Sequence, residues 1–402
     1  MKNILNLKNA MIRPVSSSKY LVAMIMLLSC AGISCGKLEL GGGGTTTSPN
    51  APGGATGKQF NYIFKEKTNG FAVFRIPAIA KSKNGTLLAF AEARKLASAG
   101  DSGDIDLVLR RSLDNGKTWE ELITVWNDGA NTCGNPVPIV DEETGVIHLL
   151  MNWNNGEDTY GEINNMTSID TRRVYYTQSA DDGKTWKTPV EITSSVKNSN
   201  WRWHGTGPCH GIQISEGTFK GRLVVPCYYY DGTNGKTYSN TVVSDDHGLT
   251  WKLAGITPQD QGGECAVTEL SGAKLMLNIR TNATNRLVTT SIDGGNTWGN
   301  LSTDFSLLDP QCQGSLLSYK NNSVVNLFFA NAASAERVNM TVKQSLNEGS
   351  TWAKVFTVHT GPSAYSDLVK ISDQEIAILY EGGIGRPYEG ISFEIIKISD
   401  FK

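Results

Sequence analysis

Three arginines that lie far apart in the sequence carry side chains suited to binding an anion. Arg75 lies in the motif FRIP, whereas Arg280 (in LNIRT) and Arg337 (in AERVNMTV) lie at the ends of predicted strands. The chain has 37 Lys and Arg against 39 Asp and Glu, so its composition predicts no basic face and no nucleic-acid partner. An anionic ligand must therefore be held by local arginines, and these three could meet if the fold gathers them at one axis.

An eight-residue repeat, Ser-x-Asp-x-Gly-x-Thr-Trp, marks the elements that would position these arginines. Its five copies are residues 112–119, 179–186, 244–251, 291–298 and 345–352. The last copy has Asn347 in place of Asp. Each copy is typical of a hairpin turn, because Asp accepts hydrogen bonds from nearby backbone N–H groups, Gly can take φ > 0, and Trp can anchor the turn on apolar surface.

The spacing of the copies indicates the fold class. Successive copies start 67, 65, 47 and 54 residues apart. Repeats spaced by about 40 to 50 residues are typical of propeller blades, in which each antiparallel sheet buries its faces against its neighbours. Short β-branched and aromatic runs lie between the copies, without helical periodicity of comparable length. We therefore predict an all-β propeller, with insertions in the longer gaps.

The N-terminal residues 1–29 read as an export signal, with basic residues ahead of an apolar run at 20–28 that is too short to span a bilayer. Residues 27–30 (LLSC) resemble the lipobox of bacterial lipoproteins, which makes Cys30 the predicted lipid-bearing residue and Cys35 a weaker candidate. An ordinary cleaved secretory signal is the alternative. Residues 30–59 form a predicted tether rich in Gly, Thr, Ser and Pro, and residues 60–402 form the folded domain. We expect an exported protein that is lipid-anchored to the cell envelope, or alternatively periplasmic or secreted.

The cysteines and histidines do not indicate a metal or disulfide scaffold. The folded domain has an odd number of cysteines without CxxC spacing, namely Cys133, Cys209, Cys227, Cys265 and Cys312. Its histidines show no ligand spacing. We therefore predict neither a metal site nor a cofactor.

The FRIP motif, the five repeats behind it and the order of the charged residues together resemble the exo-sialidases (neuraminidases), from about Phe60 to Lys402. This resemblance implies a six-bladed propeller of four-stranded antiparallel blades. It also implies a central pocket that removes terminal sialic acid from glycans, glycoproteins or gangliosides with retention of configuration. A monomer is expected.

The resemblance assigns Arg75, Arg280 and Arg337 to the triad that grips the carboxylate of the sugar. A guanidinium offers a planar fork of donors that fits a carboxylate bidentately and stays charged. Glu381 resembles the acidic partner of the first arginine, since a carboxylate among apolar neighbours needs such a partner. Arg94 resembles a further arginine near the carboxylate and a ring hydroxyl.

The same resemblance places Tyr365 and Glu264 beside the anomeric carbon, as nucleophile and base. Sialic acid carries a carboxylate on the reacting carbon, so a neutral phenol avoids the like-charge repulsion that an Asp or Glu nucleophile would meet. Sialidases are a known exception among glycosidases in this respect. Asp101, in a Gly- and Ser-containing loop, is the predicted general acid, with Asp104 as the alternative, while Asp106 reads as a strand residue.

Three further side chains are predicted to border the sugar by resemblance. Tyr228 and Tyr230 lie in the strand RLVVPCYYY and share a face by strand periodicity, and Gln313 lies in CQGS. Ordinary blade packing is the alternative role for the tyrosines.

Two other functions remain open at this level. A trans-sialidase would pass the sugar to an acceptor sugar instead of water. A non-catalytic propeller would only bind sialoglycans, but it would be expected to have lost one of Tyr365, Glu264 or Asp101. We therefore expect an exo-α-sialidase that works through a tyrosyl-enzyme intermediate.

Overall fold

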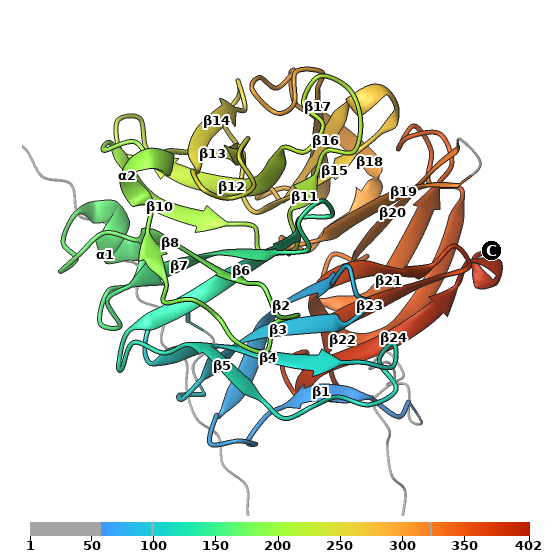
Figure 1. Ribbon diagram of the computed structural model, residues 1–402, viewed down its shortest axis with the longest axis horizontal. Coiled ribbons are helices and arrows are strands. Elements are labelled where there is room, and N and C mark those ends of the chain that lie inside the picture. The colour runs from blue at the N-terminus through green and yellow to red at the C-terminus, as the bar shows by residue number, and fades with distance from the viewer. Residues whose placement is uncertain (1–57, 98–99, 322–323) are drawn as a thin grey trace, which may run out of the picture. The chain divides into compact units, whose positions relative to one another are not determined.

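The computed structural model describes residues 58–97, 100–321 and 324–402 (Figure 1). The predicted signal, Cys30 and nearly all of the predicted tether lie outside these residues. Within the described ranges, no helix is both long enough and apolar enough to cross a membrane.

The described residues form four β-sheets in which neighbouring strands are antiparallel, apart from one parallel bridge between β4 and β6. The largest sheet contains β2 (Val73–Lys81), β3 (Leu87–Arg94), β4 (Ile105–Ser112), β5 (Ile123–Trp126), β6 (Thr132–Val140), β7 (Ile147–Asn154), β8 (Arg173–Ser179) and β9 (Val190–Glu191). The second contains β10 (Trp201–Thr206), β11 (Ile212–Gln213), β12 (Leu223–Asp231), β13 (Lys236–Ser244) and β14 (Lys252–Ile256).

The third sheet contains β15 (Cys265–Glu269), β16 (Leu275–Ile279), β17 (Asn285–Ser291) and β18 (Ser302–Leu308). The fourth contains β19 (Ser315–Asn321), β20 (Val324–Ala332), β21 (Val338–Ser345), β22 (Lys354–Ser372), β23 (Glu375–Gly382), β24 (Gly390–Lys397) and β1 (Tyr62–Lys65). The prediction of an all-β fold is confirmed.

Helical structure in the described residues is short. It comprises α1 (Tyr160–Asn165), α2 (Thr193–Val196) and the 3₁₀ turns Ser271–Ala273 and Ile398–Asp400. Both α-helices fall in the two longest gaps between repeat copies, where insertions were predicted.

Each repeat copy forms the turn that follows one strand, and the copies begin at the last residues of β4, β8, β13, β17 and β21. In the first copy, the backbone N–H and the hydroxyl of Thr118 donate to the Asp114 carboxylate at 2.9 and 2.6 Å. Gly116 has φ +84°, as the pattern predicted. In the last copy, Thr351 N donates to Asn347 Oδ1 and Asn347 Nδ2 donates to Thr351 Oγ1, both at 2.9 Å. The amide therefore replaces the carboxylate without loss of the turn.

Two features of the fourth sheet position the site. The first half of the 19-residue strand β22 pairs with β21 and its second half pairs with β23. The pairing register with β23 shifts between Ser363 and Ser366, so Tyr365 lies within the irregularity. Such irregularities re-aim side chains near active sites. The N-terminal strand β1 pairs with β24 near the other end of the chain (Figure 1).

Apolar side chains hold successive sheets together. Leu150 of the first sheet packs with Val225 of the second, in a cluster that also includes Trp251 of the third repeat copy. Other clusters join the second sheet to the third, the third to the fourth, and the fourth to the first, the last of these through Phe74 and Phe393. Each fully buried side chain of this size contributes about 1.5–3 kcal/mol.

Candidate active site

Strand starts, strand ends and the middle of β22 bring five of the predicted residues to one cavity of about 450 Å³. Arg75 lies near the start of β2, Glu264 directly before β15, Arg280 directly after β16, Arg337 directly before β21, and Tyr365 within β22. The cavity is lined by these residues together with Asp101, Tyr160, Trp203, Tyr228, Thr237, Gln261, Gly262, Gly263, Thr281, Asn282 and Tyr388.

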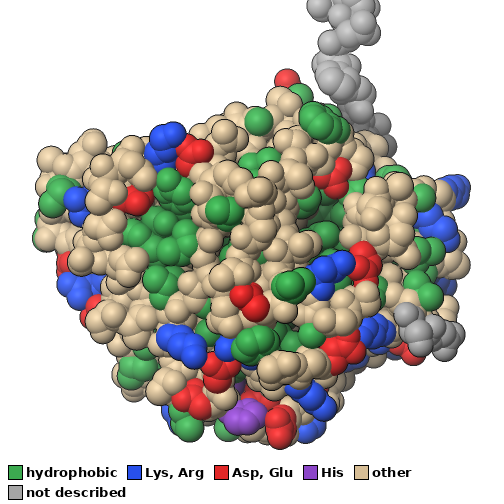
Figure 2. Space-filling view, turned by 90° about the horizontal axis from the view of Figure 1, so that it is seen from above, with side chains coloured by type: hydrophobic (Ala, Val, Ile, Leu, Met, Phe, Trp, Pro, Cys, Tyr) green, Lys and Arg blue, Asp and Glu red, His purple; other side chains and the backbone are tan. Residues whose placement is uncertain are grey.

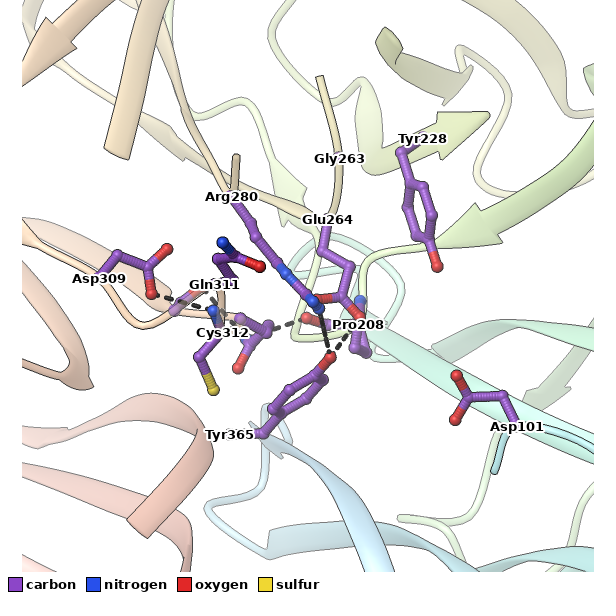
Figure 3. Close-up of polar contacts among 12 residues, drawn as sticks. Asp101, Pro208, Tyr228, Gly263, Glu264, Arg280, Asp309, Gln311, Cys312 and Tyr365 are labelled. Carbon is purple, nitrogen blue, oxygen red and sulfur yellow. Dashed lines mark hydrogen bonds and ion pairs between the residues drawn. The ribbon is translucent and has the colours of Figure 1, made fainter. Parts of the chain in front are cut away.

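Tyr365 and Glu264 form the centre of the site (Figure 3). The Tyr365 hydroxyl lies 2.7 and 2.8 Å from the two carboxylate oxygens of Glu264. Arg280 Nη1 donates to the same hydroxyl at 2.8 Å and to Glu264 Oε2 at 2.5 Å. Burial and the Glu264 charge raise the pKa of Tyr365 well above its ordinary value, although Arg280 and Arg75 oppose this. The phenol is therefore neutral at rest, and Glu264 is placed to take its proton.

The three predicted arginines converge on Tyr365. Besides the contact from Arg280, the guanidinium carbon of Arg75 lies 5.2 Å from the centre of the Tyr365 ring and that of Arg337 lies 5.6 Å from it. Burial lowers the pKa of Arg280, but the Glu264 charge outweighs it and leaves that pKa raised. The cavity therefore gathers three permanent cations around one neutral phenol, a setting that favours a carboxylate ligand.

Glu381 holds Arg75 and the backbone around it. Its Oε1 accepts from Arg75 Nε at 3.0 Å and from Ile76 N at 2.9 Å. Its Oε2 accepts from Arg75 Nη2 at 3.2 Å and from Tyr365 N at 3.1 Å. The Glu381 side chain has no exposed surface, so these four bonds compensate a buried charge. One carboxylate thus fixes both an arginine and the strand that carries the tyrosine.

Arg94, which was predicted to lie near the carboxylate of the sugar, does not line the cavity, and its hydrogen bonds go to Glu92, Gly100 O and Asp101. Its guanidinium donates to Glu92 Oε2 at 3.1 Å from Nε and at 2.5 Å from Nη2, and also to Asp101 Oδ1 at 3.0 Å. Asp101 faces the cavity and its side chain is 55% exposed. Figure 3 places Asp101 across from the Tyr365–Glu264 pair with its carboxylate directed toward it.

The alternative acid residues lie elsewhere. Asp106 pairs with Lys95 at 3.4 Å and accepts from Asn127 at 2.5 Å. Asp104 lies 3.9 Å from Lys95, and neither aspartate lines the cavity. Of the aspartates in this segment, Asp101 is therefore the one that geometry favours as the acid.

Desolvation raises the pKa of Asp101, but the charge of Arg94, followed by those of Arg75 and Arg172, holds it below its ordinary value. Arg172 is almost completely buried beside the cavity, with its guanidinium carbon 3.9 Å from the ring of Trp203. The resting site thus stabilises Asp101 as a carboxylate.

Of the three residues predicted to border the sugar, only Tyr228 lines the cavity, where it accepts a hydrogen bond from Trp203 Nε1 at 3.1 Å. Tyr230 is not among the lining residues. Gln313 is buried, and its amide donates to Pro208 O at 3.0 Å and accepts from Ser366 N at 3.0 Å. Gln313 therefore links the backbone at Pro208 to the backbone beside Tyr365 and does not line the cavity.

Three aromatic lining residues were missed from the sequence. Tyr160 begins α1 in the longest gap between repeats, Trp203 lies in β10, and Tyr388 lies in the turn between β23 and β24. The alternation Trp201, Trp203 in a short strand was the one available signal for Trp203.

The C-terminal ends of β2, β6, β15 and β22 line a separate cavity of about 830 Å³. Its lining includes Lys81, Glu269, Lys320 and Lys370, but none of the predicted site residues.

Within the described part of the chain, no group of three His, Cys, Asp or Glu side chains is arranged to hold a metal ion. The five cysteines of the folded domain are all buried and unpaired. On the face seen in Figure 2, acidic and basic side chains intermingle and form no continuous basic area.

Comparison with known proteins agrees with this geometry. Residues 85–378 match the BNR repeat-like domain. An exo-alpha-sialidase of Aspergillus fumigatus is 31% identical over 339 residues, covering 78% of this chain and 79% of that protein. A sialidase of Bacteroides fragilis is 31% identical over 351 residues, covering 82% of this chain and 63% of that protein. The solved structure of the Hadza microbial sialidase Hz136 aligns with a TM-score of 0.75 and 30% identity, covering 82% of this chain and 67% of that one.

The fold and site therefore define a BNR-repeat glycosidase scaffold built around an arginine-lined cavity. Within that class, the chain belongs to the exo-sialidase family.

Proposed function

We propose that the protein is a retaining exo-α-sialidase that hydrolyses terminal α-ketosidic sialic acid from glycans, glycoproteins or gangliosides. The observation that carries this proposal is the contact of Arg75, Arg280 and Arg337 with the ring or hydroxyl of Tyr365. A carboxylate bound by the three guanidinium groups would bring the anomeric carbon next to the phenol. A neutral sugar could not supply the negative charge that these three guanidinium groups attract, which gives selectivity for an acidic sugar.

In the first step, the Tyr365 oxygen bonds to the anomeric carbon as the bond to the leaving oxygen breaks. Glu264 accepts the phenolic proton, and Asp101 protonates the departing oxygen. In the second step, Asp101 takes a proton from water, the water oxygen bonds to the anomeric carbon, and the bond to Tyr365 breaks. The phenolate recovers its proton from Glu264. Two displacements at the same carbon give net retention.

Arg280 contributes to both steps. Its Nη1 donates to the Tyr365 oxygen, where negative charge grows when the intermediate breaks down, and to Glu264, which it orients. A fixed donor aimed at developing charge is a strong source of transition-state stabilisation.

The strand order supports a propeller of six four-stranded blades as part of this proposal. Consecutive strands pair in six antiparallel groups: β2–β5, β6–β9, β10–β14, β15–β18, β19–β22 and β22–β24. The long strand β22 belongs to the last two groups, and β1 pairs with β24 to complete the sixth. The five repeat copies follow the third strand of the first five groups. In the last group this connection is replaced by the two ends of the domain, which explains why a sixth copy is missing.

We also propose export, lipid attachment at Cys30, and a monomeric catalytic domain. The sequence of residues 27–30 supports lipid attachment. Expression of the full chain and a Cys30→Ser variant in a lipoprotein-processing bacterium tests it by membrane fractionation. The variant should move to the soluble fraction, and an unchanged membrane fraction would exclude anchoring through Cys30.

Hydrolysis is tested with a fluorogenic α-sialoside and purified protein, using Tyr365→Phe as the control. The wild type should release sialic acid, with the α-anomer appearing first by NMR, and a 2,3-difluoro sialosyl inactivator should label Tyr365. If the wild type releases no more product than the control, the enzymatic proposal fails. Product transfer to added lactose in preference to water would instead indicate a trans-sialidase.

A further inference from the structure

Tyr388 lies between two arginines of the proposed carboxylate site. The guanidinium carbon of Arg75 lies 4.4 Å from the centre of the Tyr388 ring, closer than to the Tyr365 ring at 5.2 Å. Arg337 Nη1 donates to the Tyr388 hydroxyl at 2.8 Å. The Tyr388 side chain thus contacts Arg75 through its ring and Arg337 through its hydroxyl oxygen.

The turn that carries Tyr388 is held by its own hydrogen bonds. The Glu389 carboxylate accepts from the backbone N–H groups of Ile384, Gly385 and Arg386 at 3.0, 2.8 and 3.2 Å. Arg386 forms an ion pair with Glu66, and Glu66 N donates to Glu389 O at 3.1 Å. The turn is therefore fastened to the segment that follows β1, which limits the positions open to Tyr388.

The same hairpin supplies both supports of Arg75. Glu381, at the end of β23, accepts from Arg75 Nε and Nη2, while Tyr388 lies against the guanidinium from the other side of the turn. Among the described residues Arg337 forms no ion pair, and its other hydrogen bond goes from Nη2 to Gln311 O at 3.2 Å. The hydroxyl of Tyr388 is thus a principal support for the Arg337 side chain.

We propose that Tyr388 is a positioning residue that holds Arg75 and Arg337 in the arrangement that binds the substrate carboxylate. This inference rests on the proposed sialidase function and adds a residue to its carboxylate site. Arginine side chains lose considerable rotamer freedom when they are fixed. Because Tyr388 contacts both arginines before the ligand binds, they lose this freedom when the protein folds. The entropy loss therefore does not weaken ligand binding.

The test compares Tyr388→Phe, which keeps the ring but removes the hydroxyl, with Tyr388→Leu, which removes both contacts. Tyr62→Phe is the matched control, because the Tyr62 hydroxyl donates to Gly382 O in the same hairpin at 3.3 Å but lies outside the cavity lining. Each variant is assayed for kcat and KM on a fluorogenic α-sialoside. Calorimetry then measures affinity for 2,3-didehydro-2-deoxy-N-acetylneuraminic acid and for its uncharged methyl ester.

Loss of a hydrogen bond to a charged group predicts that Tyr388→Phe lowers kcat/KM and affinity for the acid about 10-fold. Loss of the cation–π contact as well predicts a fall of roughly 100-fold for Tyr388→Leu. The ratio of acid affinity to ester affinity should fall by the same factors, whereas Tyr62→Phe should match the wild type. An equal loss for acid and ester would show a merely structural role and overturn the proposal.

Other outcomes separate this inference from the proposed function. If the wild type hydrolyses the sialoside and both Tyr388 variants stay within about twofold of it, the positioning role is refuted while the function stands. If the wild type binds the acid in preference to the ester without hydrolysis, and Tyr388→Leu loses that preference, the positioning role stands and the hydrolytic function fails. A wild type that neither hydrolyses the sialoside nor distinguishes acid from ester refutes both.

Discussion

Replacing Glu381 with Gln tests how the site is assembled, because the two residues have nearly the same shape but differ in charge. Each oxygen of Glu381 accepts one bond from Arg75 and one from a backbone N–H, of Ile76 or Tyr365. In either orientation, the NH₂ group of Gln would face two donors, so two hydrogen bonds are lost. Arg75, which is 5% exposed, would also keep its charge without its partner.

Breaking a buried ion pair by removing one partner costs about 3–5 kcal/mol. We therefore expect Glu381→Gln to lower the free energy of unfolding by about that amount in a urea titration. We also expect it to lower kcat/KM by at least about 100-fold, since both Arg75 and the backbone of Tyr365 lose their anchor.

Glu394→Gln is the control for this experiment. Glu394 lies on the neighbouring strand β24, accepts from the Tyr380 hydroxyl at 2.7 Å and pairs with Lys58 with 28% of its side chain exposed. A change of no more than about 1 kcal/mol is expected there. A Glu381→Gln protein as stable and as active as the Glu394→Gln control would refute the argument that one buried carboxylate organises the site.

Two further predictions concern other charged groups. Arg280→Ala should lower kcat/KM on a fluorogenic sialoside by roughly 100-fold or more. Arg110→Ala, which removes a half-buried arginine bonded to Glu120 O outside the cavity lining, should have little effect on kcat/KM, and comparable activities of the two variants would contradict the triad assignment. The hydrogen bond from His247 to Asp141, at 2.7 Å, raises the pKa of His247. Its contribution to stability is therefore complete below the unfolded-state pKa of about 6.5 and is lost as the pH rises through the folded-state pKa. The stability difference between wild type and His247→Gln in urea titrations should accordingly be larger at about pH 5 than at about pH 9, and equal differences would contradict this.

The repeat turns could be predicted from the sequence because their interactions are local. Asp114 and Thr118 are four positions apart, so the pattern itself contains both partners of the bond. Arg75 and Glu381 are 306 positions apart, and only resemblance to a family paired them in advance. Tyr388 carries no pattern at all, because its role depends on which arginines the fold places beside its turn.

Strand periodicity was only a partial guide to the cavity lining. Tyr228 and Tyr230 share a face, but two residues advance the chain by about 6–7 Å, which is enough to carry the second tyrosine past the cavity. Gln313 was expected to border the sugar only because the segment CQGS resembles one in the exo-sialidases. Its amide instead satisfies buried backbone groups of two other segments, a demand that becomes apparent only when the sheets are assembled.

The charge state of Asp101 links substrate binding to acid catalysis. Desolvation raises the pKa of Asp101, but Arg94 and then Arg75 and Arg172 hold it low in the ligand-free site, where an acid catalyst would be deprotonated. A bound carboxylate that pairs with Arg75 offsets part of this positive charge, so the pKa of Asp101 should rise in the complex.

The pH dependence of kcat/KM reports the free enzyme and that of kcat reports the complex. The limb that falls with rising pH should therefore lie at higher pH for kcat than for kcat/KM on a fluorogenic sialoside. In Arg94→Gln, loss of the largest opposing charge should move the kcat/KM limb upward, toward the kcat limb. If the two limbs coincide in the wild type, substrate binding does not change the pKa of Asp101. The surrounding cations would then lower that pKa equally in the free enzyme and in the complex.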